Sequence, residues 1–142
     1  MVLHADVVRR KLLAIEQAVS RLRAWLPVTA ERLETDVLLQ WAVERGLQIA
    51  AEALFDLGSH LLAGEFQETV DRYADVPTRL VARGVLRPET SERLRGLAGF
   101  RNVLVHDYAE VDLAIVAQGM QRLDDFVAFV ADVERWMQST GR

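Results

Sequence analysis

Apolar residues recur at every third or fourth position through most of the chain, and this spacing constrains the fold more than any other feature. One such series predicts a helix from about Leu3 to Trp25: Val8, Leu12, Ile15, Val19, Leu22 and Leu26. A second predicts a helix from about Asp36 to Leu62: Val43, Leu47, Ala50, Leu54, Leu57 and Leu61. Steps of four and three align side chains along one stripe that packs in a bundle. No stretch alternates as a strand would, so the sequence predicts an all-α protein.

Helix-breaking and capping residues mark the expected ends of the first two helices. Pro27 ends the first, because the residue before a proline avoids helical angles. Thr29 is expected to cap a short helical turn, and either Thr35 or Asp36 to cap the second long helix. Gly64 is expected to end that second helix.

The middle of the chain predicts shorter pieces. The spacing of Phe66, Val70 and Tyr73 predicts a short third helix, which Pro77 interrupts or kinks and Gly84 ends. Pro88 can begin the next helix as its first residue, and that helix is expected to run on to Val105. It contains Gly96 and Gly99, which weaken a helix and suggest that another backbone approaches closely there.

The last helix is expected from about Asp112 to Met137. Its inward side chains are Leu113, Val116, Met120, Leu123, Phe126, Val127, Val130, Trp136 and Met137. Such a stripe is far more typical of a hydrophobic core than of a surface that stacks nucleic-acid bases. The sequence therefore predicts an up-and-down bundle of four to five helices with a broken third helix. Residues 1–142 are expected to form a single domain of this kind.

Composition excludes several classes of protein. Hydrophobic residues make up 51% of the 142 residues and charged residues 27%, as in a globular protein. The net charge of −4 argues against a protein that coats nucleic acid through a general positive field, although a local cluster of arginines is compatible with it. Without cysteine, thiol chemistry and Cys-ligated zinc are excluded. No apolar run is long enough for a membrane span or a signal peptide, so a cytoplasmic location is expected.

The stretch Gly99-Phe100-Arg101-Asn102-Val103-Leu104-Val105-His106-Asp107-Tyr108 gathers most of the chemically capable residues. The Arg101 guanidinium keeps its charge and offers a planar fork that suits phosphate oxygens. His106 can accept or donate a proton near neutral pH. Together they suffice to cleave a phosphodiester without a metal. RNA is the natural substrate, because its ribose 2′-OH can serve as the internal nucleophile.

Arg101 and His106 are five residues apart, roughly 140° round an ideal helix. They can therefore converge on one target if the helix ends near Val105, or if a second chain supplies part of the site. An arginine a few residues before a histidine is also common by chance, and a histidine near a helix C-terminus is favoured by the helix dipole alone.

The longer stretch from Gly99 to Tyr108 resembles the signature of the HepT-type toxins of the HEPN superfamily, in which Arg, four residues, His, one residue and Tyr mark a ribonuclease site. The segment from Glu44 to Leu62 is similar to the long second helix of that family. The resemblance covers essentially the whole chain. It implies a homodimeric, metal-independent endoribonuclease toxin of a type VII-like toxin–antitoxin pair, with no cofactor. It also implies silencing by an MntA-like minimal nucleotidyltransferase antitoxin, which transfers AMP to the tyrosine matching Tyr108.

The expected site is a composite RNA cleft where two copies of the motif meet across a twofold axis. Arg101 holds the phosphate and His106 transfers protons, which leaves a 2′,3′-cyclic phosphate end. Asn102 and Asp107 are supporting residues that orient the histidine or the phosphate. For Asn102 the alternative is a local backbone hydrogen bond, and for Asp107 a solvated surface carboxylate. Tyr108 can stack on a base, satisfy a buried partner or accept AMP.

Two further questions stay open at the level of sequence. A polar row steps by four along the second long helix and lines the cleft, holds a metal through its last two members, or is simply a solvated face: Glu44, Gln48, Glu52, Asp56 and His60. The alternative function is a non-catalytic dimeric helical module that binds a nucleotidyltransferase partner or a nucleotide.

Overall fold

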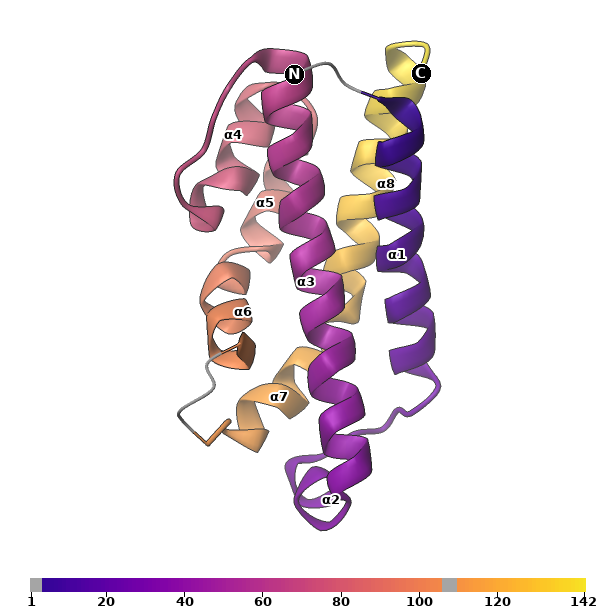
Figure 1. Cartoon of the computed structure of the whole chain (residues 1–142), viewed down its shortest axis with the longest axis vertical. Helices are drawn as coiled ribbons and strands as arrows, with labels where there is room; N and C mark the ends of the chain where they lie inside the picture. The colour runs from indigo at the N-terminus through magenta and orange to yellow at the C-terminus, as the bar shows by residue number, and fades with distance from the viewer. Residues whose placement is uncertain (1–3, 106–109) are drawn as a thin grey trace.

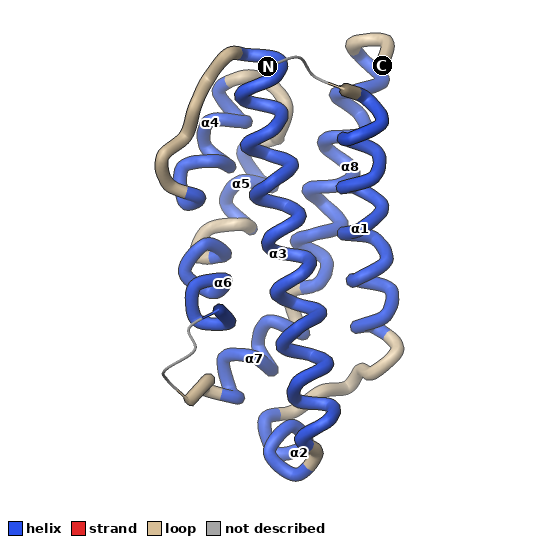
Figure 2. Tube along the Cα trace, in the orientation of Figure 1, coloured by secondary structure: helices blue, strands red, loops and turns tan. Residues whose placement is uncertain are grey.

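The computed structural model describes residues 4–105 and 110–142, and over these ranges it consists of helices joined by loops, without strands (Figure 2). The described residues form α1 (Ala5–Arg23), α2 (Ala30–Thr35), α3 (Val37–Phe66), a 3-10 turn η1 (Tyr73–Asp75), α4 (Val76–Ala82), α5 (Pro88–Arg93), α6 (Leu97–Val105), α7 (Leu113–Met120) and α8 (Leu123–Ser139). The predicted all-α bundle is thereby confirmed. None of the described helices is both long and apolar enough to cross a membrane.

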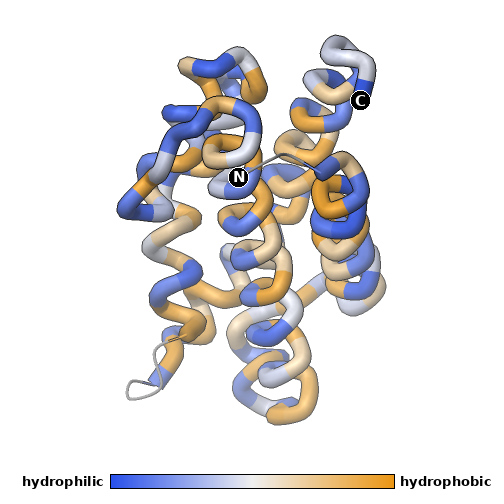
Figure 3. The backbone as a smooth tube through the Cα atoms, turned by 45° about the horizontal axis from the view of Figure 1, so that its top comes forward, coloured by the Kyte–Doolittle hydropathy of each residue, from blue (hydrophilic) through white to orange (hydrophobic). Residues whose placement is uncertain are grey.

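Helix α3 is the central element of the bundle. Its 30 residues give it a length of about 45 Å. α1 and α8 lie on one side of it, and α4, α5 and α6 lie on the other (Figure 1). Apolar and polar positions alternate at short intervals along the helices, as expected when each helix buries one side (Figure 3). The largest fully buried side chains include Phe55 of α3 and Phe129 of α8.

The capping residues act as the sequence predicted. The Thr29 hydroxyl accepts a hydrogen bond from the Arg32 amide at 3.1 Å and begins α2. The Asp36 carboxylate accepts one from the Leu39 amide at 3.1 Å and begins α3, which decides between the two predicted caps. Gly84 has a φ of 74° just after α4 and supplies the expected C-terminal stop.

Two predicted helix ends are wrong. α3 does not end at Gly64 but continues to Phe66, because Gly64 is buried against the core and the helix is held by packing. Its last carbonyls are then closed by Gln67, which adopts a left-handed φ of 51°. Pro77 does not interrupt a helix that started earlier. It lies in the first turn of α4, where a missing N–H costs nothing.

Two predicted continuous helices are each divided in two. The helix expected from Pro88 to Val105 is broken at Gly96, whose φ of 88° is incompatible with a right-handed helix and separates α5 from α6. The last helix is likewise divided into α7 and α8 around Gln121 and Arg122. Val127 of α8 is also 43% exposed, so its predicted inward position is wrong.

Close helix approach occurs at glycines other than the two that the sequence suggested. A Cβ added at Gly46 of α3 would lie 2.7 Å from a methyl carbon of Leu22 in α1, and one at Gly119 of α7 would lie 2.5 Å from the Phe100 ring. Within the part of the chain that the structure describes, a Cβ at Gly96 or Gly99 would meet no atom within 4 Å. Gly96 is therefore required for its backbone angle and Gly99 leaves open space beside α6.

Candidate active site

Arg101 lies on α6 where this helix packs against α3. Its guanidinium carbon is 5.3 Å from the centroid of the Tyr73 ring, a cation–π contact. One terminal nitrogen lies 3.5 Å from the Glu52 carboxylate and the other donates to the Asn102 side-chain oxygen at 3.3 Å. About a quarter of the Arg101 side chain (26%) is exposed. The guanidinium is thus held by Tyr73, Glu52 and Asn102 and remains open to solvent on one side.

An aromatic pair supports Arg101. Tyr73 stacks on Phe55 with ring centroids 4.9 Å apart and an interplanar angle of 2°. The Tyr73 hydroxyl donates to the Asp56 carboxylate at 3.3 Å. Burial, together with the Asp56 charge and this hydrogen bond, raises the pKa of Tyr73, so its hydroxyl stays protonated. The ring is therefore a fixed, neutral platform on which the arginine rests.

Sequence reasoning missed Tyr73 and Phe55 as site residues. Tyr73 counted only as an apolar position of a third helix, and Phe55 lies in the middle of a long helix. The available signal was the polar row of α3, because its members Glu52 and Asp56 contact Arg101 and Tyr73.

That polar row divides between the alternatives that the sequence left open. Glu52 and Asp56 line the site, as the cleft interpretation predicts. The Glu44 carboxylate instead accepts a hydrogen bond from Gln40 at 3.4 Å on the same helix. His60 has a buried Nε2 with no partner among the described residues, and burial followed by the charge of Lys11 lowers its pKa.

The row gives no support to the metal site considered for Asp56 and His60. Within residues 4–105 and 110–142, no three histidine, aspartate or glutamate side chains gather closely enough to hold a metal ion.

Asn102 is exposed on α6 and accepts the Arg101 hydrogen bond with its side-chain oxygen. The hydrogen bond that the structure gives the Asn102 side chain is therefore to a guanidinium and not to the backbone. His106, Asp107 and Tyr108 lie outside the described residues, and so does their geometry relative to Arg101. α6 is helical through Val105, and the predicted end of the helix near that residue falls at the boundary of the described range.

Several arginines near the site are paired with carboxylates. Arg79 and Arg83 both contact Glu68, at 2.6 and 3.0 Å, and their hydrogen bonds lower the pKa of that carboxyl. Arg87 is bound to the buried Asp132 at 2.9 Å. These three arginines are spaced by four residues, but they share two carboxylates, so the positive charge of this edge is only partly neutralised.

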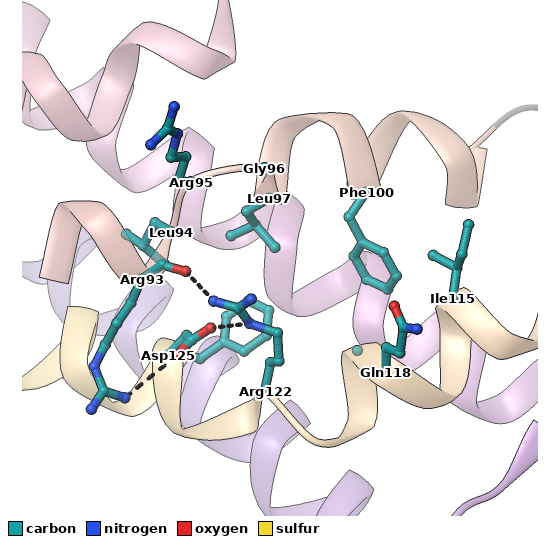
Figure 4. A pocket seen from close by; sticks show the side chains of 12 residues that line it. Arg93, Leu94, Arg95, Gly96, Leu97, Phe100, Ile115, Gln118, Arg122 and Asp125 are labelled. Carbon is teal, nitrogen blue, oxygen red and sulfur yellow. Dashed lines mark hydrogen bonds and ion pairs between the residues drawn. The ribbon is translucent and has the colours of Figure 1, made fainter.

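A hollow of about 240 Å³ lies where the break between α5 and α6 meets the break between α7 and α8 (Figure 4). Arg122 crosses it and donates to the Asp125 carboxylate and to the Arg93 carbonyl, both at 2.7 Å. The Arg93 guanidinium shares Asp125 at 3.5 Å, whereas the Arg95 side chain points away from this group (Figure 4). The two guanidinium groups thus share one carboxylate in a network that joins α5 to α8.

The part of α3 and α6 nearest Arg101 also exposes apolar side chains. Ile49, one turn before Glu52, is 38% exposed, and Val103, two residues after Arg101, is 36% exposed. Further toward the start of α3, Trp41 is 67% and Leu38 83% exposed. Exposed apolar groups of this size on one helix are typical of an interaction surface.

Comparison with known proteins identifies a family and a set of relatives. A family model described as ribonuclease HepT-like matches residues 15–133. A protein of Shewanella oneidensis described as the mRNA nuclease HepT is 28% identical over 126 residues, which cover 88% of this chain and 94% of the relative. The solved structure of a tri-AMPylated Shewanella oneidensis HEPN toxin in complex with an MNT antitoxin superimposes with a TM-score of 0.80 and 26% identity. The match covers 93% of this chain and 99% of that one. YutE, a cytosolic protein of Bacillus subtilis, shares the fold with a TM-score of 0.80 at 16% identity, covering 94% of this chain and 90% of its own.

Proposed function

The chain belongs to the HepT-like ribonuclease family, and from this membership we propose that it is an endoribonuclease toxin that cleaves RNA at a site built around Arg101. The observation that carries the proposal is the placement of Arg101. Its guanidinium lies on the neutral Tyr73 ring, faces solvent on one side and has one carboxylate, Glu52, beside it. A phosphate group can bind at the open side by charge-assisted hydrogen bonds.

In the proposed reaction His106 removes the proton from a ribose 2′-OH. The 2′ oxygen attacks the adjacent phosphorus, and the bond to the 5′ oxygen of the next nucleotide breaks. That oxygen takes up a proton, which leaves a 2′,3′-cyclic phosphate and a 5′-hydroxyl end. Arg101 offsets the negative charge that gathers on the phosphate oxygens in the transition state. Asn102 orients the Arg101 guanidinium, as their hydrogen bond suggests, and Asp107 is assigned the orientation of the histidine.

We propose that two chains form a homodimer in which both motifs face a shared cleft. The exposed Ile49 lies one turn before Glu52, the partner of Arg101, and the exposed Trp41 extends the same apolar strip along α3. A twofold interface on this strip brings Arg101 of one subunit toward the motif of its partner. The C-terminal part of the motif can then come from either chain.

The proposed control of the toxin is covalent. An MntA-like nucleotidyltransferase transfers AMP to Tyr108, in line with the AMPylated state and the antitoxin complex of the Shewanella toxin. A phosphate and a nucleoside attached two residues from His106 would occupy the cleft and repel RNA. We assign the toxin and its partner to the cytoplasm, where the RNA substrate is present.

The decisive experiment compares the purified parent chain with His106→Ala and Arg101→Ala on single-stranded RNA. Loss of a charge-stabilising donor such as Arg101 typically lowers turnover by about 10²–10³, and loss of a general base such as His106 by about 10²–10⁴. Both variants should therefore lose almost all cleavage while their helical content and dimer mass stay unchanged. Cleavage at the parent rate by a folded, dimeric His106→Ala variant would contradict the assignment.

Two further arms test the metal-free mechanism and the control. Cleavage by the parent should persist in excess chelator, and a loss that one divalent ion restores would refute metal independence. Tyr108→Phe should escape silencing by an active MntA-like partner and retain cleavage. Complete silencing of that variant would place the control elsewhere.

A further inference from the structure

A second hollow, of about 380 Å³, lies between α4, α5 and α6 on the other side of the α5–α6 break. We call it the Gly99 hollow. Phe55 and Gly99 are among the residues that line it. Polar groups of its lining come from Thr78, Ser91, Glu92 and Arg95. Pockets of a few hundred Å³ hold small ligands or single groups of larger ones. This hollow therefore suits one nucleotide and not a duplex.

The Gly99 hollow adjoins the Arg101 site through a pair of stacked aromatic rings. Phe55 forms part of the hollow and stacks on Tyr73, and Arg101 lies over the opposite partner of that stack. Ala98 also lines the hollow and precedes Arg101 by three residues, about one turn of α6, so the two lie on the same side of that helix. A strand whose phosphate binds Arg101 therefore has a neighbouring hollow within reach of its next base.

We propose that the Gly99 hollow is a binding subsite for one unpaired RNA base adjacent to the cleaved phosphate. The proposal rests on the ribonuclease function proposed above and adds where the substrate base is held. Sequence-selective proteins bind single-stranded RNA by drawing individual bases out and hydrogen-bonding their edges. Ser91 and Glu92 present such groups at the wall of the hollow.

The charge at the rim fits the same occupant. Arg95 is 80% exposed and pairs at 3.3 Å with Glu92, which is 72% exposed. Exposed pairs of this kind are weak, so the guanidinium is available to a phosphate or to the face of a base. In contrast, Arg93 and Arg122 in the hollow on the other side are held by the largely buried Asp125. Arg95 borders both hollows, but of these three cations it is the least constrained, and its side chain points away from the Arg122 network (Figure 4).

Because Gly99 has no side chain, a larger residue at this position tests whether the hollow binds a base. A Cβ there meets no atom of the described residues within 4 Å, so Gly99→Leu adds volume at the hollow without a clash at its first carbon and also strengthens the helix. Parent, Gly99→Leu and Ser91→Ala are incubated with a random-sequence single-stranded RNA pool, and the cut ends are sequenced. Gly99→Leu should lower kcat/KM roughly tenfold or more, the loss of one base contact, with an unchanged or higher melting temperature. Ser91→Ala should shift the base composition at the cut while adding no volume.

The size-matched control is Ala131→Leu, an exposed position in the groove between α1 and α8, which should cut as the parent does. Parent-like rate and cut-site composition in Gly99→Leu would overturn the subsite while leaving the ribonuclease proposal intact. A lower melting temperature together with an unchanged cut-site composition in both variants would show a structural role and also overturn it. Absence of cleavage by the parent itself would refute the ribonuclease function and, with it, the subsite.

Discussion

Arg101 lies between an aromatic ring and a carboxylate, and these two neighbours have opposite effects on its function. The Tyr73 ring fixes the guanidinium without neutralising it, because Asp56 and burial keep the tyrosine protonated. The Glu52 carboxylate lies 3.5 Å from a terminal nitrogen of the Arg101 guanidinium, the group that an RNA phosphate would bind. Both side chains are partly exposed. Substrate binding therefore requires Arg101 to exchange one anionic partner for another.

This competition predicts that Glu52→Gln strengthens RNA binding. A partly exposed ion pair contributes about 0.2–1 kcal/mol, so the dissociation constant should fall by roughly 1.5- to 5-fold at low salt. The measurement is fluorescence anisotropy of labelled RNA in a His106→Ala background, which prevents cleavage. Glu44→Gln removes the same charge two turns away on α3 and serves as the control. Weaker binding by the Glu52 variant, or an equal gain in the control, would refute the competition.

Among the helices, the α5–α6 break has the largest effect on the site. Gly96 turns the chain with a positive φ, and α6 then starts in a new direction and packs Arg101 against α3. The same break leaves open space on both of its sides. A continuous helix, as the apolar spacing predicted, would hold Arg101 elsewhere.

Gly96→Ala should therefore destabilise the protein although its methyl group touches nothing. An alanine held at this φ costs about 1 kcal/mol or somewhat more, and urea unfolding should show that loss. Gly96→Asn should lose less, because asparagine enters the left-handed region more readily. An alanine variant as stable as the parent would mean that α5 and α6 can join into one helix.

At the scale of the whole molecule, the buried carboxylate of Asp132 in α8 links this helix to the start of α5. The Asp132 carboxylate is completely buried and accepts hydrogen bonds from the Arg87 amide at 3.0 Å, the Arg87 side chain at 2.9 Å and Arg135 at 3.1 Å. Burial alone would raise the pKa of Asp132, but the Thr90 hydroxyl, the Arg87 amide and the two guanidinium groups lower it. The carboxylate is therefore stabilised in its charged form.

Asp132→Asn should lower the free energy of unfolding by about 2–3 kcal/mol at neutral pH, since it weakens hydrogen bonds to a buried charge. The pKa of Asp132 is lower in the folded state than in the unfolded state. Its contribution is therefore complete above about pH 4, the ordinary value for aspartate, and is lost as the pH falls through the folded pKa. Urea unfolding of parent and variant at several pH values should show a stability difference that shrinks in acid. A difference that is constant down to the lowest pH would contradict this role.

Much of the framework was predictable from local patterns. The stripes of α1 and α3, the caps Thr29 and Asp36 and the stop at Gly84 depend on interactions within a few residues, which a sequence displays directly. Arg101 and Asn102 were likewise recognised from a short motif, and both lie in the described site. Their proposed partners His106, Asp107 and Tyr108 remain predictions.

The breaks at Gly96 and around Gln121 could not be predicted, because apolar spacing continues across both and only packing against α3, α5 and α6 decides where the chain turns. The platform beneath Arg101 is of the same kind. Glu52 precedes Arg101 by 49 residues, and Tyr73 comes from the 3-10 turn η1, which is also distant from α6 in the sequence. The sequence by itself thus determined the helical class and the reactive side chains, since both are local properties. Only the tertiary structure decided what surrounds them, because contacts between distant helices depend on how the whole core packs.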